Sequence, residues 1–512
     1  MKKTTTKIIA LFLCLLTVIQ LSAPFASAAY FKDYTLTVNS SKKILNTNTA
    51  RWSSPKTSFM YENNGRFFIV NVTDKVTVTT YSPEFNKLAE TSIAFELPLW
   101  GGFFSGKTYN YMVFGQTNTE ENTSKETYRI VKYDKTFKRL DSASITGAQC
   151  NTTVPFDAGS VAMAENTDGS ELTVHTSRER FTSEDGLNHQ SQFTVILDTA
   201  TMTPKNDLQL FQNNHVSHSF NQLVQYNGNT PVLVDHGDAY PRSIVLSQRQ
   251  ANGYYTELDL LDIPGATGAN CTGVNLGGFE ISENNYIVAV NSIDHSKVTS
   301  FDSFNMYGLD KDERNAVLLI SAKGNTAEAN VKKVYLTDYV NKNLHATAPY
   351  LVKISNTKFV AMWKEYKLVE STGYSGSKYF SYEENGVKYV TVDESGNKLE
   401  QVQALSAPCN LSDCQPIYSD GKIIWYYEAS ATERRICTLD LNATAPAYDL
   451  GDINFDRKIN SADALLVLQH SVKIITLTGE KFTNADVNKD NSINSLDALK
   501  ILQFSVGKID QF

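Results

Sequence analysis

Hydrophobic and polar positions follow two different patterns along this chain. From about residue 30 to residue 441, short runs rich in Val, Ile, Tyr and Phe alternate with polar positions and end at Asn, Asp or Gly. Clear examples are residues 67–71, 76–81, 128–133 and 193–197. Alternation with a period of two is typical of β-strands that bury one face. The pattern therefore predicts an all-β region without a long helix.

Strands and turns recur in this region at a spacing of roughly 50 to 60 residues, which suits the four-stranded blades of a β-propeller. Turns at residues 133–137, 197–200, 321–324 and 392–396 mark the repeat. The spacing predicts about seven blades. Residues 416–441 supply only about three strands, so we expect residues 34–38 to complete the last sheet and close the ring. Tandem β-sandwiches are the alternative fold, but weak repetition and the lack of Pro/Gly/Ser-rich linkers favour the propeller.

A different pattern begins near the C-terminus, where two twelve-residue segments, 452–463 and 486–497, repeat at an offset of 34 residues. Each places oxygen-bearing side chains at positions 1, 3, 5, 9 and 12 and a backbone carbonyl at position 7, a donor set that Ca²⁺ prefers. The predicted ligands of the two EF-hand-like loops are Asp452, Asn454, Asp456, Lys458, Asn460 and Asp463, and Asp486, Asn488, Asp490, Ser492, Asn494 and Asp497, with Lys458 and Ser492 acting through their carbonyls.

The two loops depart from the EF-hand pattern at positions 6 and 12. Arg457 and Asn491 replace the usual glycine, and Asp463 and Asp497 replace the usual glutamate. Asn accepts a left-handed backbone more readily than Arg does. We therefore expect the first site to be the weaker one.

A helix with an apolar stripe is predicted after each loop. The two stripes consist of Ala464, Leu465, Leu468 and Val472, and of Ala498, Leu499, Leu502 and Val506. We expect both stripes to form the core of a small domain. Two such helices bury little surface, so bound calcium is expected to supply much of the folding free energy.

Duplicated Asp-x-Asn-x-Asp loops, each followed by one helix and lacking an entering helix, resemble the type I dockerin family. The resemblance covers about residues 449–512, after a short linker at 442–448. It implies two bound calcium ions and a cohesin partner on the scaffoldin of a cellulosome-like, polysaccharide-degrading complex. It also implies that positions 10 and 11 of each loop contact the cohesin, in either of two orientations, because the two faces are similar. These positions are Ser461, Ala462, Ser495 and Leu496.

Residues 1–29 have the layout of a secretory signal peptide, with an early cluster of lysines, an apolar run at 8–19 and small residues at 26–29. A membrane anchor is the less favoured alternative, because the apolar run is shorter than about 18 residues. Removing the three lysines of this segment changes the formal net charge from −8 to −11. The prediction is a secreted, acidic protein without a membrane span, and the charge argues against nucleic acid as a partner.

Five cysteines remain outside the predicted signal peptide: Cys150, Cys271, Cys409, Cys414 and Cys437. Their spacing does not match a metal site. A Cys409–Cys414 disulfide and five free thiols are both compatible with the sequence.

Candidate chemistry in the β region gathers at residues 215–222 and 235–242. With His215, the candidate catalytic or binding residues are His218, Asp235, His236, Asp238, Tyr240 and Arg242. These groups suit acid–base catalysis, carboxylate binding, metal binding or stacking on a sugar. The alternative is that they are structural polar groups inside a blade, and strand alternation places neighbours on opposite faces. This region is similar to secreted bacterial propellers of unassigned function.

Three functions remain open for the β region: a glycan-binding propeller, a glycoside hydrolase or polysaccharide lyase, and a protein-binding or structural component. Common motifs of hydrolases, such as Gly-x-Ser-x-Gly and His-Glu-x-x-His, do not occur in the sequence. Trp52, Trp100, Trp363 and Trp425 are candidate stacking platforms for sugar rings.

Overall fold

The computed structural model describes residues 29–38, 52–210, 216–302, 304–372, 376, 378–405, 409–442, 450–454, 458–478, 480–509 and 511–512. Residues 1–28 of the predicted signal peptide, His215 and nearly all of the predicted linker lie outside these residues. The chain divides into two compact units, Asp33–Thr438 and a unit that contains Leu439–Phe512.

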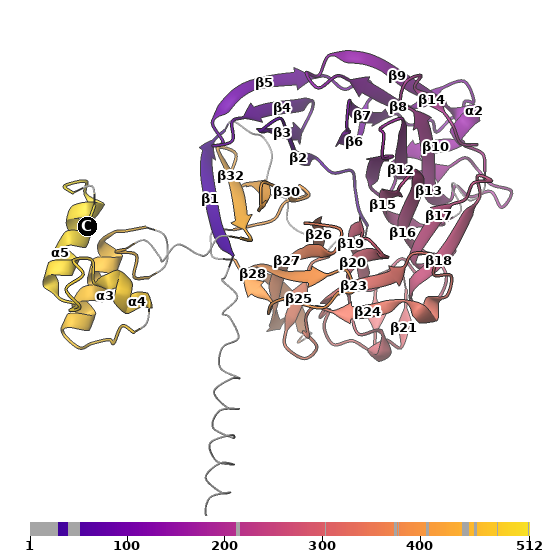
Figure 1. Cartoon of the computed structure of the whole chain (residues 1–512). Helices are drawn as coiled ribbons and strands as arrows, with labels where there is room; N and C mark the ends of the chain where they lie inside the picture. The colour runs from indigo at the N-terminus through magenta and orange to yellow at the C-terminus, as the bar shows by residue number, and fades with distance from the viewer. Residues whose placement is uncertain are drawn as a thin grey trace, which may run out of the picture. The chain divides into compact units, whose positions relative to one another are not determined.

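The first unit is a β-propeller with seven blades in its described part, arranged as a ring in Figure 1. The first blade consists of β2 (Ser58–Asn63), β3 (Arg66–Val72), β4 (Val76–Tyr81) and β5 (Lys87–Ile93), and the second of β6 (Leu99–Ser105), β7 (Asn110–Gly115), β8 (Glu126–Tyr133) and β9 (Arg139–Thr146). The third consists of β10 (Thr152–Pro155), β11 (Val161–Glu165), β12 (Glu171–Arg180), β13 (Gln190–Asp198) and β14 (Thr203–Pro204), and the fourth of β15 (Ser219–Asn227), β16 (Thr230–Asp238), β17 (Arg242–Arg249) and β18 (Tyr255–Asp262). The fifth consists of β19 (Val274–Ile281), β20 (Asn285–Ser292), β23 (Asn315–Ala322) and β24 (Lys332–Tyr335), and the sixth of β25 (Leu344–Ala346), β26 (Tyr350–Lys353), β27 (Lys358–Thr372), β28 (Lys378–Asp393) and β29 (Gln403–Ala404).

The seventh blade joins the two ends of the β region. Its strand order is β1-β32-β31-β30, with β1 (Tyr30–Thr37), β30 (Ile417–Ser419), β31 (Lys422–Glu428) and β32 (Glu433–Asp440). The first strand of the chain thus completes the last sheet, as the sequence predicts. The propeller is confirmed, and the tandem-sandwich alternative is wrong.

Hydrophobic side chains fill the spaces between neighbouring blades. One cluster joins the fourth and fifth blades through Val232, Ile244, Val288 and Leu319, and similar clusters join the other neighbours. A middle strand of a blade is covered on both faces by the two neighbouring blades, which explains why all six residues of β7 are buried. Trp363 and Trp425 are fully buried in this core, so these two tryptophans are not stacking platforms.

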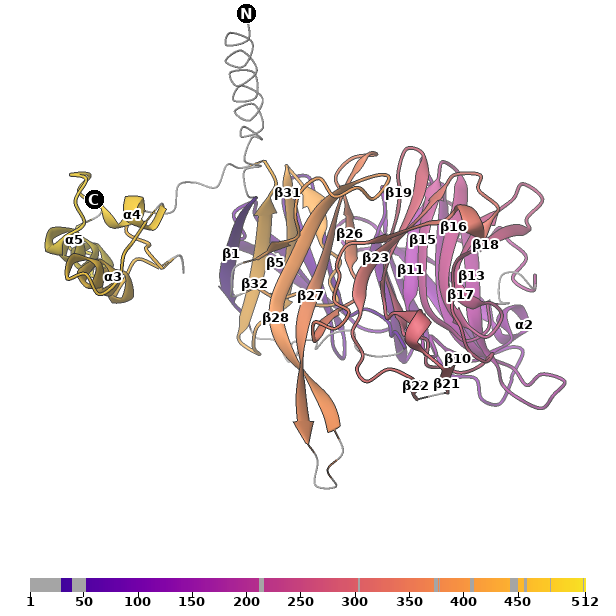
Figure 2. The same ribbon diagram turned by 90° about the horizontal axis from the view of Figure 1, so that it is seen from below.

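The innermost strands of the blades surround a small central channel of about 260 Å³. They all begin at the same face of the ring, which we call the loop face. Figure 2 shows that the long β27–β28 hairpin and the β21 (Ser300–Phe301) and β22 (Met306–Tyr307) ribbon extend on one side of the ring. Short helical turns are α2 (Gly147–Cys150), η3 (His295–Lys297) and η4 (Glu328–Asn330).

The second unit is built from three helices, α3 (Ser461–Ser471), α4 (Glu480–Ala485) and α5 (Ser495–Ser505). Its core contains Ile453, Ala464, Val467, Leu477, Ala485, Val487, Ile493, Ala498 and Ile501. No helix in the described part of the chain has the length and hydropathy needed to cross a membrane.

The predicted core stripes of α3 and α5 are mostly wrong. Ala464 and Ala498 are buried, but the other six stripe residues are exposed: Leu465, Leu468, Val472, Leu499, Leu502 and Val506. Adjacent positions on a helix lie about 100° apart, so each predicted stripe combined two faces. The core instead uses the alanine and the residue three positions later, Val467 in α3 and Ile501 in α5.

Candidate functional sites

The calcium loops start the two long helices of the second unit. Asn460 and Asn494, at position 9, are the N-caps of α3 and α5, and each side chain accepts a hydrogen bond at 2.8 Å from the N–H two residues later. Asp463 and Asp497, at position 12, accept in return from the N–H of the capping asparagine at 3.0 Å. These reciprocal bonds form a capping box, which fixes where each helix begins.

The second carboxylate oxygen of each position-12 aspartate holds the start of its loop. Asp463 accepts hydrogen bonds from the N–H groups of Ile453 and Asn454, and Asp497 accepts one from Asn488. Asp486 accepts from the N–H groups of Asp490 and Asn491. Each loop is therefore wrapped around carboxylates that its own backbone orients.

The donor chemistry of these loops fits a calcium ion. Asp463 and Asp497 are fully buried and Asp486 is almost so, yet in the described part of the chain none of the three pairs with a Lys, Arg or His side chain. Burying an unpaired carboxylate is costly, and a bound cation removes that cost. Asn491 has a φ of 62°, the left-handed conformation expected at position 6.

Among the described residues, no three His, Cys, Asp or Glu side chains are grouped as metal ligands. Asp456 and Arg457 of the first loop lie outside those residues. The predicted ligand set mixes carboxylate with amide and carbonyl oxygens, and the asparagines and carbonyls would complete it.

An apolar surface repeats on the two helices. It consists of Leu465, Leu468 and Val472 on α3 and Leu496, Leu499, Leu502 and Val506 on α5, all exposed. The predicted cohesin contacts Ser461, Ala462, Ser495 and Leu496 are also exposed, at the helix starts. We call these residues together the helix face. The sequence pattern identifies most of these apolar residues, but it predicts that they are buried in the core, and they are exposed.

The dockerin type I domain profile matches residues 450–504, which include both loops and nearly all of both long helices. Residues 450–504 are a type I dockerin. The domain accounts for the duplicated loops and supports docking into a complex that carries cohesins.

Comparisons for the rest of the chain are distant, and no curated protein sequence matches it. A puromycin-hydrolysing peptidase of Mycobacterium tuberculosis has 10% identity and a TM-score of 0.40, over 77% of this chain and 55% of that one. PorZ of Porphyromonas gingivalis has 10% identity and a TM-score of 0.36, over 75% and 47%. BBS1N, solved with ARL6DN, has 11% identity and a TM-score of 0.41, over 82% and 99%. The chain thus spans about half of the first two proteins, and such low scores say nothing about function.

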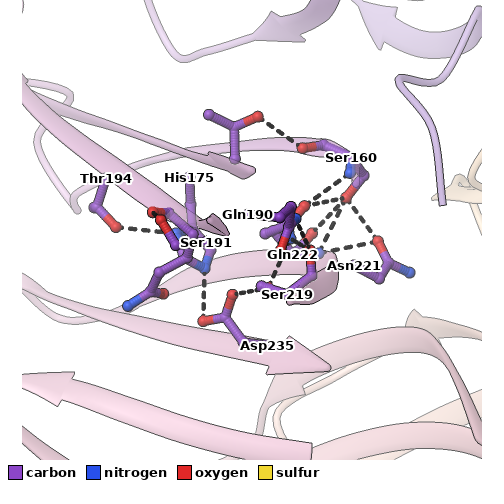
Figure 3. Close-up of polar contacts among 11 residues, drawn as sticks. Ser160, His175, Gln190, Ser191, Thr194, Ser219, Asn221, Gln222 and Asp235 are labelled. Carbon is purple, nitrogen blue, oxygen red and sulfur yellow. Dashed lines mark hydrogen bonds and ion pairs between the residues drawn. The ribbon is translucent and has the colours of Figure 1, made fainter. Parts of the chain in front are cut away.

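The candidate residues of the propeller separate into buried structural groups and a partly open site. Figure 3 shows Asp235 between His175 and Ser219, with distances of 3.0 Å to His175 Nε2 and 2.6 Å to Ser219 Oγ. All three side chains are fully buried. The Ser219 hydroxyl donates to the Asp235 carboxylate and not to the His175 ring, so this order of contacts differs from that of a Ser-His-Asp triad. This network joins the third and fourth blades.

His236 and Arg242 are also structural. His236 Nε2 lies 3.0 Å from Thr272 Oγ1, and burial lowers the pKa of His236 to about 3, so the ring stays neutral. The Arg242 guanidinium donates to the carbonyls of Pro264, Ala269 and Cys271. It therefore anchors a loop and does not bind a carboxylate.

His218 and Asp238 form the accessible part of the predicted cluster. Their Nδ1 and Oδ1 atoms lie 2.9 Å apart at the loop face, with His218 about one third exposed and Asp238 buried. The bond to Asp238 raises the pKa of His218 despite partial burial. His218 also has a φ of 52°, which is uncommon outside glycine. Tyr240 is highly exposed in the turn between β16 and β17.

Three residues near this pair were not predicted as its partners. Asp157 and Glu179 interact electrostatically, and burial first and Glu179 second raise the pKa of Asp157, while His218 opposes the rise. Trp52 is 43% exposed and lies 6.0 Å from the Phe220 ring, which in turn stacks on His218 at 6.3 Å. We call Trp52, Asp157, Glu179, His218 and Asp238 the loop-face site.

Trp52 of the loop-face site belongs to residues 52–57, a segment that precedes the first blade in the sequence. The Ser53 N–H donates to the Phe220 carbonyl of the fourth blade, and the Trp100 indole N–H of the second blade donates to the Lys56 carbonyl. Residues 52–57 therefore extend between blades before β2 begins. Trp52 was a candidate in the sequence only as one of four tryptophans, and nothing in the sequence indicated that it lies near Phe220.

Proposed function

We propose that this protein is a secreted component of an extracellular polysaccharide-degrading complex, docked there through calcium-dependent binding of its dockerin to a cohesin. The helix face is the observation that carries the proposal. Large apolar side chains are exposed at matching positions of two helices, and exposed apolar patches of this kind mark interaction surfaces. The predicted signal peptide at residues 1–29 supports secretion.

Two calcium ions belong to this proposal, one in each loop. The ion would neutralise the buried carboxylates of its loop. Asp463 and Asp497 hold the helix starts through their capping boxes, and so they connect ion binding to the position of the helix face. Loss of the ions should loosen the dockerin and remove the docking surface.

We also propose that the propeller binds glycan at the loop-face site. Trp52 offers an exposed indole for stacking on a sugar ring. Asp157, Glu179 and His218, all partly exposed, offer acceptors and a donor for sugar hydroxyls. This combination of an aromatic platform and polar groups suits a neutral polysaccharide.

A glycoside hydrolase is the second candidate, because of Asp157. A carboxyl whose pKa is raised by burial suits a general acid, and the Glu179 carboxylate lies close to it. A protein-binding role is the third candidate.

One experiment on the full-length chain separates these candidates. The protein is incubated with a panel of insoluble polysaccharides, and retention and released reducing ends are both measured. Retention without release supports glycan binding, release identifies a hydrolase, and neither result favours the protein-binding role. Docking is tested separately, by capture of the full chain on immobilised type I cohesin modules in calcium and its release by chelator.

A further inference from the structure

The five described cysteines all belong to the propeller and lie in different surroundings. All are thiols in this structure, with Cys409 partly exposed and Cys150, Cys271, Cys414 and Cys437 buried. Cys414 packs with Met60, Tyr81 and Tyr426 in the cluster between the seventh and first blades. Of the two alternatives that the sequence allows, a Cys409–Cys414 disulfide and free thiols, this structure has the free thiols.

Cys409 instead faces Cys437. The two thiols are within hydrogen-bonding reach of each other, and Tyr427 interacts with both. Cys437 lies on β32, next to β31 in the sheet. The residue after Cys409 is fixed to β31, because the Asn410 carbonyl accepts the Trp425 indole N–H at 2.8 Å. The backbone on both sides of the thiol pair is therefore held in place.

We infer that Cys409 and Cys437 form a disulfide when the protein meets an oxidising environment. Two S–H bonds break and one S–S bond forms, and the two electrons and two protons pass to a disulfide oxidant such as oxidised glutathione. This disulfide rests on the proposed function in one respect only: secretion would bring the protein into an oxidising environment.

The order of the reaction follows from exposure. Cys409 is the accessible thiol, so its thiolate attacks oxidised glutathione first and gives a mixed disulfide plus one reduced glutathione. The Cys437 thiolate then attacks the Cys409 sulfur and displaces the second glutathione. Burial raises the pKa of Cys437 well above its ordinary value. The second step should therefore be slow at neutral pH and faster as the pH rises.

The bridge would reinforce the closure of the ring. Cys409 belongs to the segment between the sixth and seventh blades, and Cys437 lies on the strand that pairs with β1. A disulfide here restricts the unfolded chain in the blade that joins the two ends of the propeller. The expected consequence is a propeller that unfolds at a higher temperature when oxidised.

The test uses the full-length chain, reduced, freed of reductant and incubated with oxidised glutathione. Remaining thiols are alkylated in denaturant, and the protein is cleaved before aspartates, which separates Cys409 from Cys414 at Asp413. The expected result is a linked peptide pair containing Cys409 and Cys437, with Cys150, Cys271 and Cys414 alkylated. Alkylation of both Cys409 and Cys437, or a Cys409–Cys414 link, would overturn the inference.

Two variants test the link without changing the buried Cys437. Cys409→Ser changes the partly exposed thiol and should remove the link, whereas Cys414→Ser should retain it. Reductant should lower the melting temperature of the oxidised wild type and of Cys414→Ser by roughly 5 °C, and leave Cys409→Ser unchanged. An equal response of all three proteins would contradict the assignment. None of these measurements involves a cohesin or a glycan, so they can fail independently of the proposed function.

Discussion

Leu465 and Leu499 occupy equivalent positions on α3 and α5, and both side chains are about half exposed, at 54% and 51%. Their loops, caps and helices repeat at the same offset of 34 residues. Each helix therefore presents the same apolar group beside the same pair of loop positions. We therefore expect the proposed cohesin partner to bind through either helix, in the two orientations that the dockerin resemblance implies.

This duplication predicts that single substitutions on the helix face have small effects. Leu465→Asp or Leu499→Asp leaves one helix intact, so affinity for a cohesin should fall by no more than about threefold. The double variant places charge in both orientations and should lose about 100-fold. Surface plasmon resonance in calcium measures both. Leu140→Asp, at an exposed leucine of the propeller, is the matched control, and a 100-fold loss in one single variant would show that one helix alone docks.

Calcium stoichiometry should follow the position-12 aspartates. Asp463→Asn or Asp497→Asn keeps an oxygen for the capping box but removes a buried negative charge, so each variant should bind one ion in place of two. The altered loop should stay empty over the calcium range that saturates the intact loop. Isothermal titration with calcium measures the number of sites. Ser492→Ala is the control, because position 7 contributes its carbonyl, and two ions bound by both aspartate variants would refute the ligand assignment.

Glycan retention should depend on Trp52. Trp52→Ala removes the exposed stacking surface, and binding to the polysaccharide that retains the wild-type protein should weaken by about tenfold. Tyr254→Ala changes a more exposed aromatic residue between β17 and β18 and should have no effect. Depletion isotherms on the insoluble polysaccharide give both affinities. Equal loss in the two variants, or none in Trp52→Ala, would place the glycan elsewhere.

The His218–Asp238 pair should make stability depend on pH. The bond to Asp238 raises the pKa of His218 in the folded protein. Its contribution is therefore complete below the unfolded value of about 6.5 and is lost as the pH rises through the folded pKa. The melting temperature of the wild type relative to His218→Gln should fall across that range and be constant above it. A difference that is independent of pH would show that the ring is not protonated in the pair.

Strand alternation and turn spacing were sufficient to predict the propeller, because both follow from local chemistry. Residues 34–38 could be assigned to the last blade because that blade lacked a strand. Exposure on α3 and α5 could not be predicted in the same way. Leu465 lies only one residue from the buried Ala464, and periodicity alone does not identify which side of a short helix faces the core.

The loop-face site illustrates a second limit. His218 and Asp238 lie at the two ends of one hairpin, so local sequence was enough to suggest them. Asp157 and Trp52 come from other parts of the ring, and only the closed fold brings them near. Arg242 was a reasonable ligand-binding candidate by residue type, but its guanidinium is used by nearby carbonyls.

We expect calcium in the dockerin to create the docking surface, and a single titration examines this dependence. The full-length protein is titrated with a type I cohesin in calcium, then in excess chelator, and again after calcium is restored. We expect one-to-one binding in calcium, an affinity for the cohesin at least about 100-fold lower in chelator, and full recovery of affinity when calcium is restored. Binding of unchanged affinity in chelator would contradict it.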